Sequence, residues 1–435
     1  MTKNNINIIL VIIFLALSSC SEKSIDEDPQ NTRFSVLKYD AEISETLTLD
    51  LSEIELGAPK EIFYWSKDFQ NPQNNIAHIF TSANFSEKKK IISGKNKPLN
   101  LIQPVFFEDN LCHFINDGFI ECINTETSET YFSIDIKRDE VKKYEFIRGG
   151  ISYFDGTIIF VDGYGQIIAL NSNSGDIIWQ KSIPFPILST PLIYRGIVYF
   201  ISADNRLFAV DFDTGETLWS FQTIVESKKS IYTASAVAFE NIILAPFSNG
   251  ELIAFKYDDG RPLWSDITSK VSLLSNFDIK DISANPVIAS NNIYTLNTNG
   301  KFLSINLING TRNWVADISG KNTPIISGNQ IYLVSDDSKL ICLNKMTGEI
   351  YWITQLEKHK KGENHKNLNL WLGPYALNND LYLISYFGEL LKVNPKDGKI
   401  LDSKNLGITG IMVEPMILSD EIYIMDIDSN VYKFK

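Results

Sequence analysis

The chain has 435 residues, of which 44% are hydrophobic and 12% aromatic, and its formal net charge at pH 7 is −13. This charge opposes binding to the phosphate backbone of nucleic acids, and no basic stripe interleaves with aromatic residues. The chain is long enough to bury a large core, and the absence of helical periodicity over long windows favours an all-β fold.

The first 19 residues have the pattern of a bacterial export signal. Lys3 supplies a positive charge, and Ile8–Leu17 is an unbroken apolar run that is shorter than the roughly 20 residues of a membrane-spanning helix. The following Ser-Ser-Cys20 completes a segment that resembles a lipobox. The resemblance implies cleavage before Cys20 and acylation of this residue, and several acyl chains together give stable anchoring. The alternative is an ordinary secretory peptide with an incidental cysteine.

Residues 20–50 are polar, with an acidic run at Asp26–Asp28 before Pro29. This composition predicts a flexible tether. Ser21 follows the cysteine, whereas an Asp at this position in enteric lipoproteins goes with retention at the inner membrane. By this resemblance we expect a lipid-anchored protein of the outer membrane that faces the periplasm.

Residues 51–435 are dominated by a repeat, best seen in Pro191–Trp219. Two strand-like runs, Ile197–Ser202 and Arg206–Asp211, precede an Asp-Thr-Gly turn and a third run that ends at Trp219. Copies start roughly every 40 to 50 residues, and one such unit cannot bury its own faces, so the copies must pack on each other. The eight copies begin at Pro104, Ile151, Pro191, Ala236, Pro286, Pro324, Pro374 and Pro415.

The eighth copy stops at Lys435, before its third run. Glu61–Trp65 resembles the tryptophan-bearing run Gly348–Trp352, so we expect it to supply the missing strand. The prediction is an eight-bladed β-propeller with four-stranded antiparallel blades and a ring closed by an N-terminal strand, which removes two free sheet edges. Within Phe69–Leu101, the basic run Lys88–Lys90 is expected to lie in a solvated loop.

Three cysteines lie within the repeats. Cys122 and Cys342 occupy a column that otherwise holds small residues, and Cys112 lies on the strand expected to pair with that of Cys122. We favour free buried thiols; a Cys112–Cys122 disulfide is the alternative if the register places both on one face.

The segment Ala209–Trp219, AVDFDTGETLW, resembles the tryptophan-docking motif of quinoprotein-type propellers, in which the Trp packs across neighbouring blades. The resemblance assigns this role to one tryptophan in the expected closing strand and to five in the repeats: Trp65, Trp179, Trp219, Trp264, Trp314 and Trp352. Two classes of protein share this motif, the pyrroloquinoline quinone-dependent dehydrogenases and the non-enzymatic BamB lipoproteins of the outer-membrane β-barrel assembly (BAM) complex.

Several features argue against an enzyme. The dehydrogenases typically carry adjacent cysteines and a calcium-binding set of carboxylates and amides; this chain has no Cys-Cys pair, and we identify no calcium set. No phosphate-binding glycine loop or nucleophile elbow is present, and His359–His365 matches no common zinc spacing. We therefore expect no catalytic residue, metal or cofactor. A dehydrogenase-like quinoprotein and a periplasmic propeller with a ligand in its central funnel remain alternatives.

The connector before Pro286 resembles the acidic loop by which BamB proteins engage the POTRA region of BamA. Asp281 matches an acidic residue of the family, Asp278 is a second carboxylate, and Ser283 stands where the family has another acidic residue. The resemblance implies a scaffold that binds BamA and other BAM subunits. For Asp281, an ordinary carboxylate that caps a turn is the alternative.

A second expected contact lies in Glu226–Tyr232. It lacks the Leu-Arg pattern of the family but keeps basic charge at Lys228 and Lys229. Exposed blade edges are further expected to accept unfolded outer-membrane protein strands by strand addition.

Overall fold

The computed structural model describes residues 43–46, 49–76, 78–94, 102–115, 118–137, 149–225, 234–268, 282, 284–297, 300–360, 362 and 367–435. Ile43–Lys435 forms one compact unit. Its described part contains 32 β-strands and a short 3-10 helix, η2 (Leu51–Glu53). None of the helices in these ranges has the length and apolarity needed to cross a membrane.

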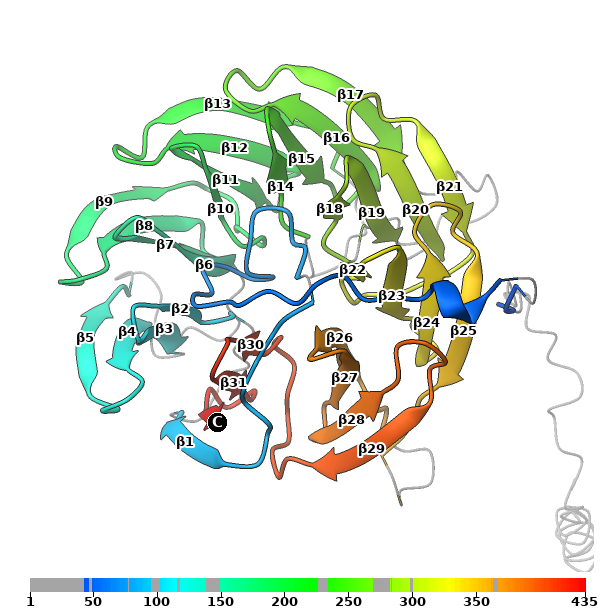
Figure 1. The fold of residues 1–435 in the computed structure, drawn as a ribbon. Helices are drawn as coiled ribbons and strands as arrows, with labels where there is room; N and C mark the ends of the chain where they lie inside the picture. The colour runs from blue at the N-terminus through cyan, green and yellow to red at the C-terminus, as the bar shows by residue number, and fades with distance from the viewer. Residues whose placement is uncertain are drawn as a thin grey trace, which may run out of the picture. The chain divides into compact units, whose positions relative to one another are not determined.

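The strands form eight four-stranded antiparallel sheets, which are the blades of a ring (Figure 1). Blade 1 is β2 (Val105–Phe107), β3 (Asn110–Ile115), β4 (Phe119–Asn124) and β5 (Thr130–Asp135). Blade 2 is β6 (Gly149–Phe154), β7 (Thr157–Asp162), β8 (Gln166–Asn171) and β9 (Ile177–Ser182). Blade 3 is β10 (Leu192–Tyr194), β11 (Ile197–Ser202), β12 (Arg206–Asp211) and β13 (Thr217–Gln222). Blade 4 is β14 (Val237–Phe239), β15 (Ile242–Pro246), β16 (Glu251–Lys256) and β17 (Pro262–Ile267).

The second half of the chain continues the pattern. Blade 5 is β18 (Val287–Ala289), β19 (Asn292–Asn297), β20 (Lys301–Asn306) and β21 (Arg312–Ala316). Blade 6 is β22 (Ile325–Ser327), β23 (Gln330–Val334), β24 (Lys339–Asn344) and β25 (Ile350–Gln355). Blade 7 is β26 (Trp371–Leu377), β27 (Asp380–Ser385), β28 (Glu389–Val393) and β29 (Ile400–Asn405). Blade 8 is β30 (Met416–Ile417), β31 (Ile422–Met425), β32 (Val431–Phe434) and β1 (Lys88–Ile92). The predicted eight-bladed propeller, closed by an N-terminal strand, is confirmed.

Burial along each blade explains the composition of its strands. The second strand of blade 3, β11, is buried at every position, because neighbouring blades cover both of its faces. The outermost strand β13 alternates between exposed and half-buried residues. Continuous apolar runs therefore form the middle of each blade, and alternating runs form its rim.

Tryptophans of the outermost strands join successive blades. Trp264 of blade 4 donates its indole N–H to the carbonyl of Leu307 in blade 5, at 2.8 Å. Its ring lies against Gly310, where an added Cβ would come within 2.7 Å of the indole. The same arrangement joins Trp179 to Gly215, Trp314 to Gly348 and Trp352 to Gly398, and Phe132 lies against Gly175 in the same way.

Trp219 differs in its hydrogen bonding. Its ring lies against Gly260, but the equivalent carbonyl, that of Tyr257, accepts the Tyr199 hydroxyl at 2.6 Å. The Trp219 indole nitrogen is buried without a hydrogen-bond partner. Ring packing, which all these junctions share, is therefore the constant feature of the junction.

This packing predicts the effect of a matched pair of substitutions. Gly310 and Gly196 have similar φ angles, +72° and +75°, but nothing lies within 4 Å of a Cβ added at Gly196. Both alanine variants carry the strain of a left-handed backbone, about 1–2 kcal/mol, and only Gly310→Ala also pushes against an indole, for about 1–3 kcal/mol more. Urea unfolding should show Gly310→Ala to be the less stable variant; equal losses would contradict the docking role.

The closing strand is not the one expected from the sequence. β1 pairs antiparallel with β32, with Lys89 opposite Lys433, so the lysine run expected in a loop forms the rim of blade 8. Lysines are common on edge strands because their charge discourages pairing with other chains. Trp65 instead lies fully buried beside blade 1, where it exchanges two backbone hydrogen bonds with Phe106 of β2. The expected role of Glu61–Trp65 as the closing strand is therefore wrong.

An ionic network joins blade 8 to blade 1. Lys433 is 4% exposed and lies between the carboxylates of Glu126, at 2.7 Å, and Glu421, at 2.5 Å. Glu126 lies in the turn of blade 1 that corresponds to the glycine turns of blades 2 to 7. Lys89, which pairs with Lys433, occupies the tryptophan position of blade 8. Charge pairing thus replaces aromatic docking at this junction.

A different replacement joins blade 7 to blade 8, where Asp402 occupies the tryptophan position. Phe85, which precedes β1, lies between Tyr382 of β27 and Phe434 of β32, with ring centroids 5.8 Å from each. Lys404 of β29 donates to the Phe85 carbonyl at 2.8 Å. The N-terminal segment therefore supplies the aromatic ring that blade 7 lacks.

The network predicts acid sensitivity at the junction between blades 8 and 1. The hydrogen bond from Lys433 lowers the pKa of Glu126 below its ordinary 4.5, so the stabilisation is present above about pH 4.5 and is lost as the pH falls through the lower folded-state pKa. Because Glu126 is largely exposed, we expect a loss of no more than about 1 kcal/mol. Urea unfolding between pH 5 and pH 3 should show a smaller loss for Glu126→Gln than for the native chain; identical losses would exclude this contribution.

Cys112 and Cys122 form a disulfide, so the favoured expectation of free thiols is wrong for this pair. The two residues lie directly opposite each other on β3 and β4, which places both side chains on one face of blade 1. Cys342 is a free buried thiol.

Candidate functional site

The N-terminal segment crosses the central channel, the usual ligand site of a propeller. Figure 1 shows this segment, in blue, running across the middle of the ring. It makes hydrogen bonds next to or within the innermost strands of blades 1, 2, 4, 5, 6, 7 and 8. The bonded pairs are Trp65–Phe106, Ser66–Tyr153, Pro72–Ala238, Gln73–Ile288, Gly57–Ser327, Ile79–Ala376 and Ile62–Ser419.

A buried ion pair lies within this segment. Lys67 is 3% exposed, contacts the Asp68 carboxylate at 2.9 Å and donates to the Asn74 side chain at 2.6 Å. The second Asp68 oxygen accepts from Ser235 beside blade 4, at 3.2 Å. The buried charge is thus both paired and hydrogen-bonded, which a stable buried ion requires.

Little space remains beside this segment. A cavity lined by Phe69, Asn74, Tyr375 and Glu414, among others, has a volume of about 10 Å³, room for no more than one water molecule. Small-molecule sites typically have about 300–1,000 Å³. The protein's own chain therefore occupies the place where a propeller would hold a ligand.

Glu414 is the titratable group at this cavity. Burial raises its pKa to about 7, and the Tyr375 hydroxyl donates to its carboxylate. Glu414 thus holds more protons in the folded state than in the unfolded state between about pH 4.5 and pH 7, so its contribution to stability falls as the pH rises through this range.

Replacing Glu414 should remove this dependence. We expect the native chain to lose on the order of 2–3 kcal/mol of unfolding free energy between about pH 4.5 and pH 7 relative to Glu414→Gln. Urea midpoints across this range measure the difference. Parallel pH profiles for the two proteins would show that Glu414 titrates normally.

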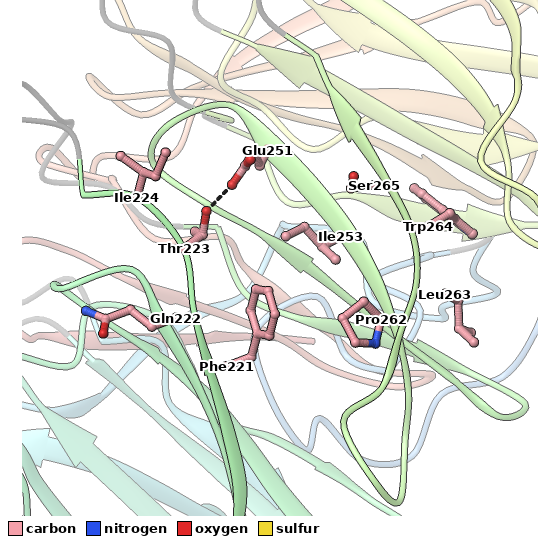
Figure 2. A pocket seen from close by; sticks show the side chains of 10 residues that line it. All are labelled: Phe221, Gln222, Thr223, Ile224, Glu251, Ile253, Pro262, Leu263, Trp264 and Ser265. Atoms are coloured by element: carbon pink, nitrogen blue, oxygen red, sulfur yellow. Dashed lines mark hydrogen bonds between the residues drawn. The ribbon is translucent and has the colours of Figure 1, made fainter.

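An open groove lies on the rim, between blades 3 and 4 (Figure 2). Its volume is about 600 Å³. Phe221–Ile224, at the end of β13, form one side, and Glu251 and Ile253 of β16 with Pro262–Ser265 of β17 form the other. Phe221, Ile253, Pro262 and Trp264 give it an apolar floor, and Glu251 places a carboxylate at one end.

Hydrogen bonds hold the end of β13 in place. The Asn205 side chain donates to the Ile224 carbonyl at 2.7 Å, and its own oxygen accepts from Ser248 at 2.7 Å. Thr223 donates its hydroxyl to Glu251, as Figure 2 shows. Ile224 is nevertheless 73% exposed. Because the backbone that carries this exposed apolar side chain is already held in place, binding a partner there would cost less ordering than binding at a mobile loop.

The partner-binding residues expected from the sequence lie outside the described residues. They are Lys228, Lys229, Asp278, Asp281 and Ser283, and the same holds for Cys20. The two connectors nevertheless start near the groove, since the described chain breaks off after Val225, next to Ile224, and after Thr268, which bonds Gly250 beside Glu251.

Sequence reasoning missed the groove itself. One signal was present: Ile224-Val225 follows the third run of its copy where later copies have Ser269-Lys270, Ser319-Gly320 and Glu357-Lys358. An apolar pair at the end of a rim strand, where polar residues suffice, indicates a contact surface. Within the described ranges, no group of three or more His, Cys, Asp or Glu side chains is placed to hold a metal ion.

Several curated proteins are similar to this chain in sequence. A protein of Rickettsia prowazekii described as uncharacterized is 24% identical over 260 residues, or 59% of this chain and 61% of that protein. A second Rickettsia relative is matched over 58% of its length, so the chain spans about three-fifths of these curated relatives. The outer membrane protein assembly factor BamB of Yersinia pestis is 25% identical over 325 residues, which cover 73% of this chain and 80% of that protein.

Solved structures share the fold. The crystal structure of BamB from Moraxella catarrhalis superposes with a TM-score of 0.67 at 17% identity, over 80% of this chain and all of that chain. A europium-containing methanol dehydrogenase superposes with a TM-score of 0.65 at 13% identity, over 88% of this chain and 90% of that one. At these identities the structures show a common fold alone.

The family assignment comes from residues 116–354, more than half of the chain, which match the family model described as outer membrane protein assembly factor BamB. The chain belongs to this family.

Proposed function

We propose that the protein is a non-catalytic scaffold of the BAM complex, which binds BamA and aids the assembly of outer-membrane β-barrel proteins. Membership of the BamB family supports this proposal. The observation that carries it is the rim groove between blades 3 and 4, which is lined by apolar side chains, including the exposed Ile224, and is held at the end of β13 by hydrogen bonds.

The anchor and the second contact belong to the same proposal. Acylation at Cys20 would tether the ring to the outer membrane on the periplasmic side, through the polar residues that follow Cys20. Asp278, Asp281 and Ser283, with Lys228 and Lys229, lie in the two connectors that start near the groove. An apolar centre with charged residues at its rim is the usual anatomy of a protein interface, and we propose that these residues contribute that charge.

The dehydrogenase reading rests on the shared fold and is weakened by the channel. The N-terminal segment bonds across it to seven blades, and the cavity beside Glu414 holds about 10 Å³. A quinone would have to displace this segment, including the buried Trp65. The same argument applies to a ligand-binding propeller with its site in the central funnel.

The decisive experiment is affinity purification of the full chain from detergent-solubilised membranes, with identification of co-purifying proteins and an absorption spectrum. We expect BamA and no quinone absorbance. Recovery without BamA, or with a bound quinone, would overturn the scaffold.

Two variants test the contact surface in the same assay. Ile224→Arg places a charge on the apolar centre, and we expect recovery of BamA to fall at least tenfold, because loss of a central contact costs roughly 1–2 kcal/mol or more. Asp281→Arg should also lower recovery of BamA, and unchanged recovery would remove Asp281 from the proposed contact. Ile178→Arg on β9, also an exposed rim isoleucine, is the control and should leave recovery unchanged; an equal loss for Ile178→Arg would show that the groove has no special role.

A further inference from the structure

The chain already contains one example of a segment bound at its rim. Residues 43–46 lie beside the outermost strand of blade 6, where the Thr46 N–H donates to the Ile350 carbonyl at 2.9 Å. The Ile353 N–H donates to the Glu45 carboxylate at 2.9 Å. Ile43 packs, with Ala316 and Ile353, against the hydrophobic cluster shared by blades 5 and 6. These residues, expected to belong to the flexible tether, thus bind along the outer edge of β25 through one backbone and one side-chain hydrogen bond.

The groove between blades 3 and 4 is the repeat equivalent of that site. In blade 6, Ile353 pairs with Ile341 and Ile350 pairs with Leu343. In blade 4, at the same ladder positions, Ser265 pairs with Ile253 and Pro262 pairs with Phe255.

The facing blades match as well. Ala316, which packs against the same cluster as Ile43, stands two residues after Trp314, and Phe221 stands two residues after Trp219 on β13. Ile253, Pro262, Ser265 and Phe221 all line the open groove. One site is therefore filled by residues 43–46, and its equivalent is an open groove in the part of the chain that the structure describes.

We propose that the groove between blades 3 and 4 binds an extended segment of a partner protein by strand addition to β17. The segment places an apolar side chain in the groove, donates a backbone N–H to the Pro262 carbonyl and accepts from the Ser265 N–H. The inference rests on the proposed function in taking the occupant to be a partner protein; the mode of binding follows from the register of the repeats.

The charge at the groove selects the sequence of this segment. Glu251 lines the groove at the position that Lys339 holds in blade 6. The segment held by blade 6 carries Glu45, whereas a carboxylate next to Glu251 would be repelled. The expected ligand therefore pairs its apolar residue with Lys or Arg, because charge complementarity governs specificity more than raw affinity.

The test uses a labelled synthetic peptide that copies residues 41–50 with Glu45→Lys, added to the purified full-length protein. Fluorescence anisotropy should show saturable binding, and the unaltered copy, with Glu45, should bind more weakly. Hydrogen exchange on the native protein should show peptide-dependent protection at β17, a readout that needs no variant. Absence of saturable binding, or protection confined to β25, would overturn the proposal.

A proline substitution tests the hydrogen bond. The Ile353 N–H points outward, to Glu45, so the equivalent Ser265 N–H faces away from β16, and Ser265→Pro removes it without breaking the ladder within the blade. We expect peptide affinity to fall at least tenfold. Ser220→Pro is the matched control, because Ser220 holds the same position on β13 but does not line the groove. Native affinity for Ser265→Pro would contradict the proposed contact.

Failure of this inference and failure of the proposed function give different results. Peptide binding at β17 without recovery of BamA from membranes would keep the groove as a peptide site and exclude the BAM partner. Recovery of BamA from an intact chain that does not bind the peptide would keep the scaffold and exclude strand addition.

Discussion

The contact between an indole ring of one blade and the glycine turn of the next governs the rest of the structure. Gly260, for example, has φ of +68°, and its α-carbon is so close to Trp219 that a Cβ would lie 2.5 Å from the ring. Only glycine accepts both constraints. The contact fixes the distance along the chain between turn and tryptophan, but it leaves the connectors between blades free to vary. Repeats of constant internal spacing with variable connectors, and a rim on which connectors carry the differences, both follow from it.

The series of contacts between an aromatic ring and a glycine turn is interrupted at two junctions, one on each side of blade 8. Blade 8 takes its outermost strand, β1, from the N-terminal segment and not through a glycine turn after β32, and blade 1 has Ser128 where blades 2 to 7 have glycine. Phe85 fills one of the two junctions, and the Lys433 network fills the other. The N-terminal segment closes the ring in two ways: it supplies Phe85 at one junction, and after crossing the channel it continues into β1 of blade 8. Closure and occupation of the channel are thus one structural solution.

Features that repeat along the chain could be predicted from the sequence, whereas features that occur only once in the fold could not. The number of blades follows from periodicity, which is visible in the chain. The closing strand carries no motif: Glu61–Trp65 resembles a rim strand but lies beside β2, while Lys88–Ile92 resembles a loop but completes blade 8. The Cys112–Cys122 disulfide could not be predicted with certainty, because it requires the two cysteines to lie opposite each other. A hydrophobic pattern leaves the strand register uncertain by one residue, and a slip of one residue would place them on opposite faces. The groove depended on two rim strands that are distant in sequence, β13 and β17, coming together in space.

The two places where a propeller can bind something therefore differ in a way that bears on function. The channel is taken by the chain itself, with Trp65 buried and a paired charge at Lys67. On the rim, the repeat generates equivalent grooves, and their use depends on what covers each one. Residues 43–46 pack against the cluster between blades 5 and 6. In the described part of the chain, the groove of about 600 Å³ between blades 3 and 4 is open, next to Ile224, whose backbone carbonyl accepts a hydrogen bond from Asn205. This exposed surface, at the point where two long connectors begin, is the basis for proposing that the protein binds its partners on the rim, and a search for them should start there.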